Sequence, residues 1–331
     1  MIRKTLISQI TSTPNIWSFS SVRVASLGRY LSNHITYPPR GMRAFRIVSK
    51  AAMTTELVHI PEIERVSPAC IRILAGNPGK FALQGTNTYI LGTGPKRLLV
   101  DTGEGKPSWI AALKKTLEEE KISIQSAVIT HWHHDHQGGI GHLREHSPET
   151  KFYKNQPEEG QLDIADGQKF EVEGATLTAF HTPGHAVDHM VFVFQEEDAL
   201  FTGDNVLGQG TTVFEDLGTY LKSLAKMEKL VSGRGYPGHG PILPQVGATI
   251  TEYISHRHER EKQVLQTLAA EKDGGLWTPV ELVKIIYRDY PESLHVPAAN
   301  GVIQILRKLR DEDKVALEDG DKWRLTDRSS L

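Results

Sequence analysis

Thr130-His131-Trp132-His133-His134-Asp135-His136-Gln137-Gly138-Gly139 is the most informative stretch of this sequence. Four of its residues form the pattern His-x-His-x-Asp-His, namely His131, His133, Asp135 and His136. Imidazole and carboxylate groups are the usual protein ligands of zinc and related divalent metals. The stretch therefore predicts a metal site, although a His-rich run can also be a surface tract.

The residues before this motif predict how it is held. Residues 124–130 have the sequence Ile-Gln-Ser-Ala-Val-Ile-Thr, a short, apolar and partly β-branched run, and Gly138-Gly139 follow the histidines. This pattern is typical of a buried strand that presents a loop at its C-terminal end, where α/β proteins place their chemistry.

Length and composition limit the possibilities. The chain has 331 residues, enough for one large domain and a small one. Its single cysteine, Cys70, excludes an intramolecular disulfide and a Cys-rich zinc ribbon, and is expected to be a packed strand residue. No apolar run approaches the roughly 18 residues that span a bilayer, so no membrane segment is expected.

The N-terminal region differs in charge from the rest. Residues 1–55 hold eight basic residues and no acidic one, so the formal net charge of −2 for the whole chain conceals an acidic remainder. An Arg- and Ser-rich segment without acidic residues is typical of a mitochondrial transit peptide, predicted here for residues 1–52. The alternatives are a disordered extension or a true start at Met53. We expect a location in the mitochondrial matrix or the cytoplasm.

The apolar periodicity predicts a mixed α/β sandwich for residues 56–250. Strands are expected at 70–74, 88–91, 97–100, 124–130, 151–154, 169–172, 176–180, 190–194 and 200–202, and helices at 106–120, 140–146 and 217–230.

Three more possible metal ligands lie downstream of the first motif. His185 follows Thr-Pro-Gly, Asp204 ends the strand at 200–202, and His239 follows Pro-Gly. One catalytic zinc needs three protein ligands and an open position, so seven ligands suffice for two metals with one bridging carboxylate. Asp101 ends another strand and is expected to orient a ligand, or else to bond its own turn. His181 and His189 match no ligand position.

This ordered set resembles the metallo-β-lactamase superfamily. The resemblance rests on Asp101-Thr-Gly, the His-x-His-x-Asp-His motif, Thr-Pro-Gly-His185, Gly-Asp204 and Pro-Gly-His239-Gly. It implies an αββα sandwich with a binuclear centre, expected to hold two Zn²⁺ per chain. By that resemblance, His131, His133 and His185 would bind the first metal, Asp135, His136 and His239 the second, and Asp204 would bridge them.

The constellation implies hydrolysis without a Ser or Cys nucleophile. Two close cations activate a water and polarise the scissile carbonyl or phosphoryl group. Asp135 is the expected catalytic residue, because it can also orient that water.

Further blocks resemble the lactamase-β-like protein 2 family and its fungal members that release polyketides from acyl carrier protein. The blocks are Gly76-Asn-Pro-Gly, Gln84-Gly-Thr-Asn-Thr, Tyr153-Lys-Asn155, 166–175, Asp188-His-Met190, Gly203-Asp-Asn-Val-Leu-Gly and 214–220. One departure is Ala186, where many relatives carry Thr or Ser.

Residues 251–331 are expected to form a connector helix and a winged-helix-like domain. The pattern predicts helices at 250–271, 279–290 and 298–313 and a hairpin at 315–325. Four basic residues could meet nucleic acid: Arg307, Lys308, Arg310 and Lys314. However, residues 256–331 carry 13 basic and 14 acidic residues, so a wall of the substrate pocket is an equally good interpretation.

Two functions follow. The first is an acyl thioesterase that releases a polyketide or other acyl chain from acyl carrier protein, with no membrane partner. The alternative is a mitochondrial metal-dependent endoribonuclease of single-stranded RNA. A metal-binding regulatory protein without catalysis is disfavoured because all seven expected ligands are present. A glyoxalase II-like thioesterase is disfavoured by the C-terminal pattern.

Overall fold

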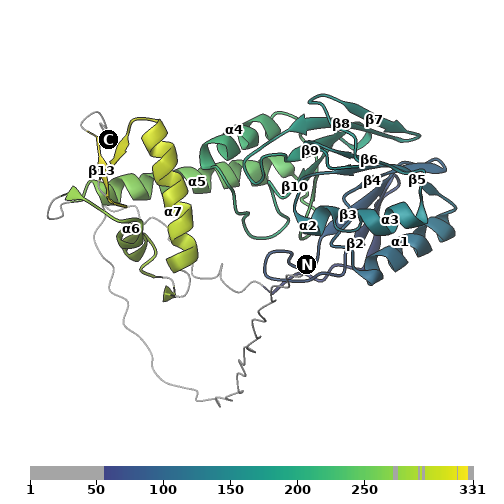
Figure 1. The fold of residues 1–331 in the computed structure, drawn as a ribbon, viewed down its shortest axis with the longest axis horizontal. Coiled ribbons are helices and arrows are strands. Elements are labelled where there is room, and N and C mark those ends of the chain that lie inside the picture. The colour runs from purple at the N-terminus through teal and green to yellow at the C-terminus, as the bar shows by residue number, and fades with distance from the viewer. Residues whose placement is uncertain (1–55, 271–274, 290, 293–294, 319, 327–331) are drawn as a thin grey trace, which may run out of the picture. The chain divides into compact units, whose positions relative to one another are not determined.

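The structure, a computed structural model, describes residues 56–270, 275–289, 291–292, 295–318 and 320–326 (Figure 1). The predicted transit peptide at residues 1–52 and the alternative start at Met53 lie outside the described residues.

The first sheet has six strands in the order β1-β2-β3-β4-β5-β6. These are β1 (Ile63–Ser67), β2 (Cys70–Leu74), β3 (Asn87–Leu91), β4 (Lys96–Val100), β5 (Ser123–Ile129) and β6 (Lys151–Lys154). The first four strands pair antiparallel, and β4, β5 and β6 pair parallel. The parallel pairs need crossovers, which are supplied by α1 (Pro107–Glu120), α2 (His134–Gln137) and α3 (Ile140–His146).

The second sheet has five strands in the order β11-β10-β9-β8-β7. These are β7 (Lys169–Val172), β8 (Ala175–His181), β9 (Met190–Phe194), β10 (Ala199–Gly203) and β11 (Gly235–Pro237), with a 3-10 turn at Gln195–Glu197. Two helices pack on this sheet, α4 (Leu217–Met227) and α5 (Val246–Leu268).

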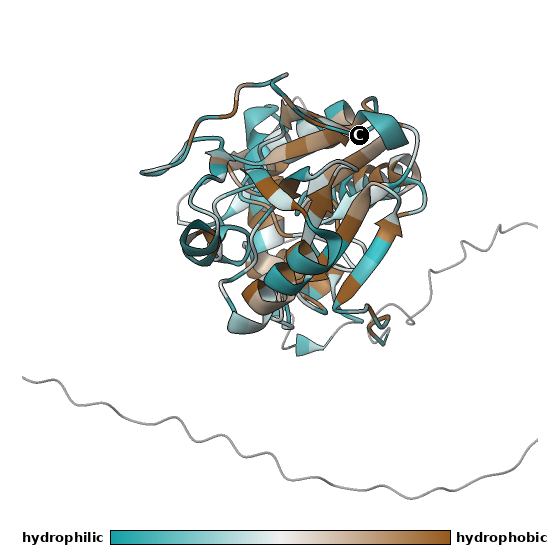
Figure 2. Ribbon diagram, turned by 90° about the vertical axis from the view of Figure 1, so that its right-hand side faces the viewer, coloured by the Kyte–Doolittle hydropathy of each residue, from teal (hydrophilic) through white to brown (hydrophobic). Residues whose placement is uncertain are grey.

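Three apolar clusters fix the layers. Along β4, Leu98 and Val100 pack between the sheets, whereas Leu99 packs with Trp109 and Leu113 of α1 on the outer face. Strands buried on both faces read as continuous apolar runs, which is why these segments show little alternation. Figure 2 shows hydrophobic residues gathered on the interior strands. The expected αββα sandwich is therefore confirmed, and Cys70 is a fully buried residue of β2.

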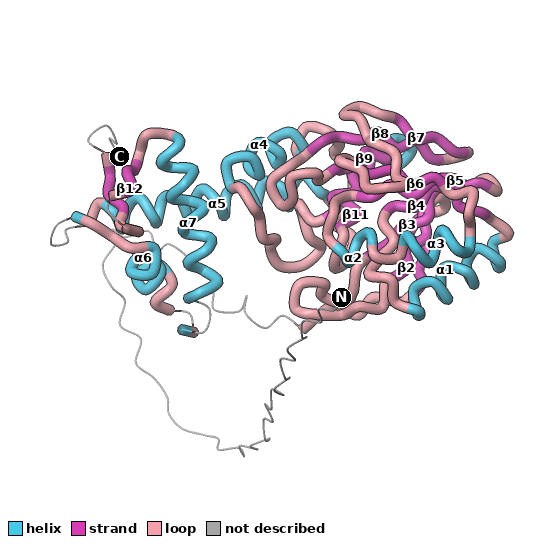
Figure 3. Tube along the Cα trace, viewed as in Figure 1, coloured by secondary structure: helices cyan, strands magenta, loops and turns pink. Residues whose placement is uncertain are grey.

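The C-terminal elements are α6 (Pro279–Ile286), α7 (His295–Asp311), β12 (Val315–Leu317) and β13 (Trp323–Leu325), as Figure 3 shows. A capping box starts α6: Thr278 Oγ1 accepts from the Glu281 amide, and the Glu281 carboxylate accepts from the Thr278 amide. The predicted helix-helix-hairpin pattern is present. The domain boundary after residue 250 stays a prediction, since α5 contributes to a core shared with α4 and α7.

The observed bounds differ from the predicted ones mainly at helix ends. Helix α5 starts at Val246 rather than residue 250, and α6 ends at Ile286 rather than 290. The short strands β1 and β11 were not predicted, because Ile-Glu-Arg-Val-Ser and Gly-Tyr-Pro lack an apolar run. Among the described residues, no helix combines the length and apolar character needed to cross a bilayer.

Candidate metal centre

All seven predicted ligands meet at one edge of the sandwich, each in a segment that follows a strand. His131 and His133 lie in the loop after β5, and Asp135 and His136 lie in the short helix α2 that continues it. The turn between β8 and β9 carries His185, and the segments after β10 and β11 carry Asp204 and His239. They form two groups whose ligand atoms lie within 4.8 Å of one another: His131, His133, His185 and Asp204, and Asp135, His136 and His239. Their role as ligands stays a prediction.

In the first group, three imidazole nitrogens converge. Nδ1 of His133 lies 2.9 Å from Nε2 of His131 and 3.1 Å from Nε2 of His185. The Asp204 carboxylate lies 3.7 Å from the same His185 nitrogen. This arrangement has the three His donors and one carboxylate that the sequence assigned to the first metal.

Hydrogen bonds to the opposite ring nitrogens fix which nitrogens carry lone pairs. His185 Nδ1 lies 2.8 Å from the Val213 carbonyl. Because a carbonyl only accepts, Nδ1 donates and Nε2 keeps its lone pair. Thr130 Oγ1 donates its single proton to the Asp101 carboxylate 2.9 Å away, so it accepts from His131 Nδ1 at 3.0 Å. The inward Nε2 atoms of both rings are therefore set up as metal donors.

In the second group, His239 Nε2 lies 3.2 Å from Asp135 Oδ2, and His136 Nε2 lies 3.5 Å from the same oxygen. Asp204 contacts this group as well, with Oδ1 3.4 Å from His136 Nε2 and Oδ2 3.2 Å from His239 Nε2. Because Asp204 also belongs to the first group, its carboxylate occupies the position that a bridging ligand requires.

The electrostatics divide the histidines into two kinds. Burial lowers the pKa of His131, His133 and His185, so these rings are neutral donors. Burial acts in the same direction on His136 and His239, but carboxylates outweigh it. Asp204, Asp101 and Asp135 raise the pKa of His136 well above its usual value, and Asp204 and Asp135 raise that of His239 to about 9. The carboxylate side of the site thus favours a positive charge.

The donor set fits a divalent metal pair. Among the described residues, three buried atoms of the predicted ligands lack a hydrogen-bond partner: His136 Nε2 and Asp204 Oδ1, which face the centre, and His239 Nδ1, whose ring turns Nε2 toward it. Buried polar atoms without partners call for an explanation such as an ion. Converging lone pairs, a shared carboxylate and the two atoms that face the centre are the features that a pair of cations would satisfy.

Asp101 behaves as the predicted orienting residue. Its Oδ2 accepts from His136 Nδ1 at 2.8 Å, and its Oδ1 accepts from the Thr130 amide at 2.8 Å. The backbone of Asp101 has a left-handed φ of 60°, a conformation that Asp tolerates better than most residues.

A second support was missed by the sequence analysis. Thr86 Oγ1 donates to Asp135 Oδ2 at 3.1 Å. The Asn77 side chain in turn accepts from the Thr86 amide at 2.9 Å and donates to the Thr86 hydroxyl at 3.0 Å. Asn77 and Thr86 belong to the Gly76-Asn-Pro-Gly and Gln84-Gly-Thr-Asn-Thr blocks, which gave the only sequence signal for this contact.

His189 and His181 are not ligands in this arrangement. His189 is fully buried, and its Nε2 accepts from the Asp204 amide at 3.1 Å, so it holds the backbone of Asp204. His181 contacts the Val187 carbonyl at 2.9 Å, away from the cluster. Ala186, next to His185, is fully buried.

A buried ion pair also supports the metal loop. Lys154 Nζ lies 2.7 Å from Asp188 Oδ2, and both side chains are almost completely buried. Asp188 Oδ1 accepts from the backbone amide of Trp132, between two of the predicted ligands, at 3.3 Å. This pair therefore ties β6 and the turn before β9 to the His-rich loop.

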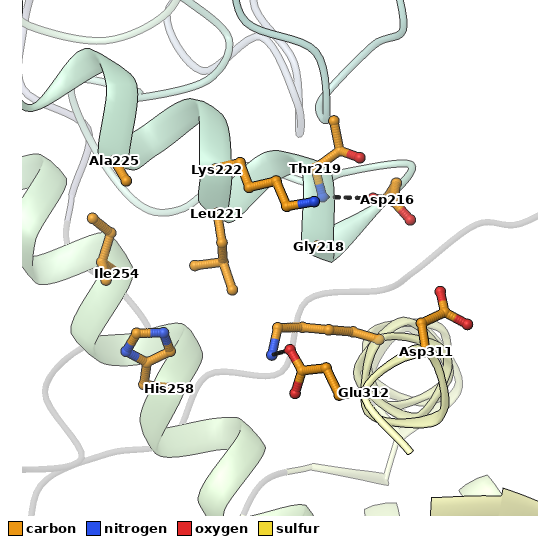
Figure 4. A pocket seen from close by; sticks show the side chains of 11 residues that line it. Asp216, Gly218, Thr219, Leu221, Lys222, Ala225, Ile254, His258, Asp311 and Glu312 are labelled. Carbon is orange, nitrogen blue, oxygen red and sulfur yellow. Dashed lines mark hydrogen bonds and ion pairs between the residues drawn. The ribbon is translucent and has the colours of Figure 1, made fainter. Parts of the chain in front are cut away.

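The metal centre opens into a cavity of about 500 Å³. Its walls are largely apolar and come from two loops, with Phe81 and Leu83 on one and Leu207 and Val213 on the other. Phe81 and Val213 are 71% and 61% exposed, so these walls offer apolar surface that a ligand could cover. A second cavity of about 670 Å³ lies between α4, α5 and α7 and contains no His/Asp cluster of this kind among its described residues (Figure 4).

Comparisons with known proteins agree with this geometry. Residues 82–239 match the metallo-beta-lactamase superfamily, and residues 278–323 match the beta-lactamase associated winged helix domain. The structure resembles a metallo-beta-lactamase family protein of Thermus thermophilus with a TM-score of 0.63 and 22% identity, over 79% of this chain and 100% of that chain. A beta-lactamase domain protein of Burkholderia ambifaria gives a TM-score of 0.69 and 16% identity, over 80% and 93%. At such identities the likeness shows the fold alone.

Two curated relatives are much more similar in sequence. One is the "Atrochrysone carboxyl ACP thioesterase" of Aspergillus chevalieri, 47% identical over 80% of this chain and 88% of the relative. Another is the "Lactamase-like protein adaB" of Aspergillus niger, 46% identical over 79% and 86%. The chain therefore belongs to the metallo-β-lactamase superfamily, as a metal-dependent hydrolase with an associated winged-helix domain and fungal lactamase-like proteins among its relatives.

Proposed function

We propose that this protein is a binuclear zinc hydrolase that cleaves acyl thioesters, with an acyl chain on acyl carrier protein as its substrate. The observation that carries this proposal is the apolar cavity directly against the His/Asp cluster. Such a cavity suits an uncharged acyl chain whose carbonyl reaches the cluster.

Two zinc ions would be held by the two groups of donors described above. His131, His133 and His185 would bind one ion, and Asp135, His136 and His239 the other, with Asp204 between them. When bound, such ions supply an activated water and polarise the carbonyl oxygen of the substrate.

The chain's own residues prepare the site for this reaction. Asp135 is the residue placed to orient the attacking water, because its Oδ2 is held by the Thr86 hydroxyl and by His239. The opposing His residues keep the pKa of the Asp135 carboxyl well below its usual value, although burial alone would raise it. Asp135 is therefore ionised and can accept a hydrogen bond from water.

The net reaction needs no other nucleophile. One water adds to the acyl carbon and the carbon–sulfur bond breaks. The products are a carboxylic acid, which contains the hydroxyl of the water, and a thiol, which receives its other proton. The buried thiol of Cys70 is no candidate nucleophile, because burial raises its pKa well above the usual value.

One curated relative supports a carrier-bound substrate. The relative from Aspergillus chevalieri is named as an acyl carrier protein thioesterase, and the similarity covers most of both chains. Cleavage of a thioester on a carrier protein is therefore the activity we propose for this chain.

The endoribonuclease alternative has less support. Lys308 and Lys314 of the predicted basic face pair with Glu261 and Glu312, at 2.7 to 3.8 Å. Lys80 is the only lysine or arginine among the described residues that line the metal cavity. RNA binding draws much of its affinity from cations that neutralise phosphates, and these side chains offer few unpaired ones.

A side-by-side assay separates the two functions. The zinc-loaded full chain would be offered an acyl thioester on carrier protein, the matching oxygen ester, and a labelled single-stranded RNA. We expect release of free thiol from the thioester and no change in the RNA. RNA cleavage without thioester cleavage would overturn the proposal.

A further inference from the structure

The loop that walls the metal cavity depends on helix α5. Residues 207–214 have no helix or strand structure, yet six of them line the cavity. Their backbone groups must find partners outside a regular element. Two side chains of α5, Tyr253 and Arg257, supply partners for three of these groups, the Leu207 amide and the Gly210 and Thr212 carbonyls. They stand four residues apart and so share one helix face.

Tyr253 holds the first half of this loop. Its hydroxyl donates to the Gly210 carbonyl at 2.8 Å and accepts from the Leu207 amide at 3.2 Å. The side chain is buried, so these two bonds are shielded from water.

Arg257 holds the second half. Its Nη2 donates to the Thr212 carbonyl at 3.0 Å, and its guanidinium carbon lies 4.8 Å from the ring centre of Phe214 and 6.0 Å from that of Tyr220. Arg257 thus contacts the residue on each side of Val213, Thr212 through its carbonyl and Phe214 through its ring. The Val213 carbonyl is the group that accepts from His185 Nδ1 at 2.8 Å.

We propose that Arg257 is a positioning residue for His185, and through His185 for the first metal of the proposed centre. Arg257 holds the Thr212 carbonyl before Val213 and the ring of Phe214 after it, and the Val213 carbonyl then fixes the tautomer and direction of the His185 ring. Groups that orient a ligand in this way govern metal affinity although they never touch the metal.

Arginine suits this role better than lysine. A planar guanidinium can stack on an aromatic ring and donate a directed hydrogen bond at the same time, whereas an ammonium group has neither the plane nor the fork. One turn further along α5, Glu261 pairs with Lys308 of α7 at 2.8 Å. The same helix therefore links the winged-helix domain to the loop that orients His185.

Zinc titration of the metal-free full chain tests this inference, with a chromophoric chelator as competitor. Arg257→Lys should weaken the first zinc about 10-fold, the lower end of the effect for groups that orient ligands. It should leave the second zinc unchanged and alter the visible spectrum of the cobalt-substituted protein. His258→Ala is the matched control, because His258 is an exposed neighbour that lines the other cavity (Figure 4). The His258→Ala chain should bind both zinc ions as tightly as the wild type.

Two outcomes for the Arg257→Lys variant would overturn the inference. Unchanged zinc affinity and an unchanged cobalt spectrum in Arg257→Lys would show that the ring of His185 needs no such support. Equal weakening of both metals, together with a lower melting temperature, would show a general loosening instead. The inference rests on the proposed metal centre but not on the proposed substrate, since the titration uses no thioester. A His185→Ala chain that keeps both zinc ions would refute the metal assignment and this inference with it.

Discussion

The carboxylate of Asp101 lies 2.8 Å from Nδ1 of His136, and both side chains are almost completely excluded from solvent. The two residues stand 35 positions apart: Asp101 directly follows β4, and His136 lies in α2, after the neighbouring parallel strand β5. The same carboxylate accepts from Thr130, so a single residue braces both sides of the His-rich loop.

Asp101→Asn should therefore weaken metal binding about 10-fold. Asp101 accepts from three donors, His136 Nδ1 and the amide and hydroxyl of Thr130. Asparagine has one acceptor oxygen in place of two, so its NH2 group would face His136 or Thr130, at a cost of about 1–3 kcal/mol in unfolding free energy. Competitive zinc titration and urea unfolding measure the two effects. Asp166→Asn, at a half-exposed carboxylate away from the cluster, is the control and should change neither by much.

His133→Ala should abolish hydrolysis and reduce bound metal, because His133 Nδ1 is the atom that lies between the other two nitrogens of its group. His134→Ala supplies a matched control, since this exposed neighbour belongs to neither donor group. The measurements are metal content by elemental analysis and the rate of thiol release. Full activity of His133→Ala would refute its assignment as a ligand.

Asp204→Asn should weaken the second metal most, because the variant loses the charge that serves both groups. Asp204 is ionised in the structure, since His239 and His136 hold its pKa well below the usual value although burial alone would raise it. Elemental analysis at limiting zinc should find close to one metal per chain. Two tightly held metals in this variant would contradict a bridging role.

Lys154→Met leaves the buried charge of Asp188 without its cationic partner, although Asp188 Oδ1 still accepts from the Trp132 amide. The unfolding free energy should therefore fall by about 3–5 kcal/mol. The double variant Lys154→Met/Asp188→Asn should lose less than the sum of the two single changes, since neither charge then remains alone. Urea unfolding measures all three variants. A loss below about 0.5 kcal/mol in Lys154→Met, typical of a surface site, would show that the pair contributes little.

The sequence was sufficient to predict the layers of the fold and which His and Asp residues gather at one edge of it. Each predicted ligand stands in a short motif with Gly, Pro or Asp beside a strong apolar run. Such motifs are local in the sequence, so they can be recognised without knowledge of tertiary contacts. The contacts of Asn77 with Thr86 and of Thr86 with Asp135 were not predictable, because the second of them joins loops 49 residues apart at 3.1 Å. The same reason hid the role of His189, whose buried ring accepts from an amide 15 residues away.

Short strands were missed for a different physical reason. Strand β11 contains only Gly235, Tyr236 and Pro237, and its position is fixed by parallel pairing with β10 rather than by its own propensity. The pairing matters for function because it brings His239 to the cluster.

We propose that two metal ions held by these seven residues make the chain a thioester hydrolase. The most direct test titrates metal-free full chain with zinc and follows bound metal and thiol release from an acyl thioester in the same samples. We predict no hydrolysis without metal and a rate that reaches its maximum at two zinc ions per chain. Full hydrolysis by the metal-free chain, or a fully loaded chain that leaves the thioester intact, would contradict the account.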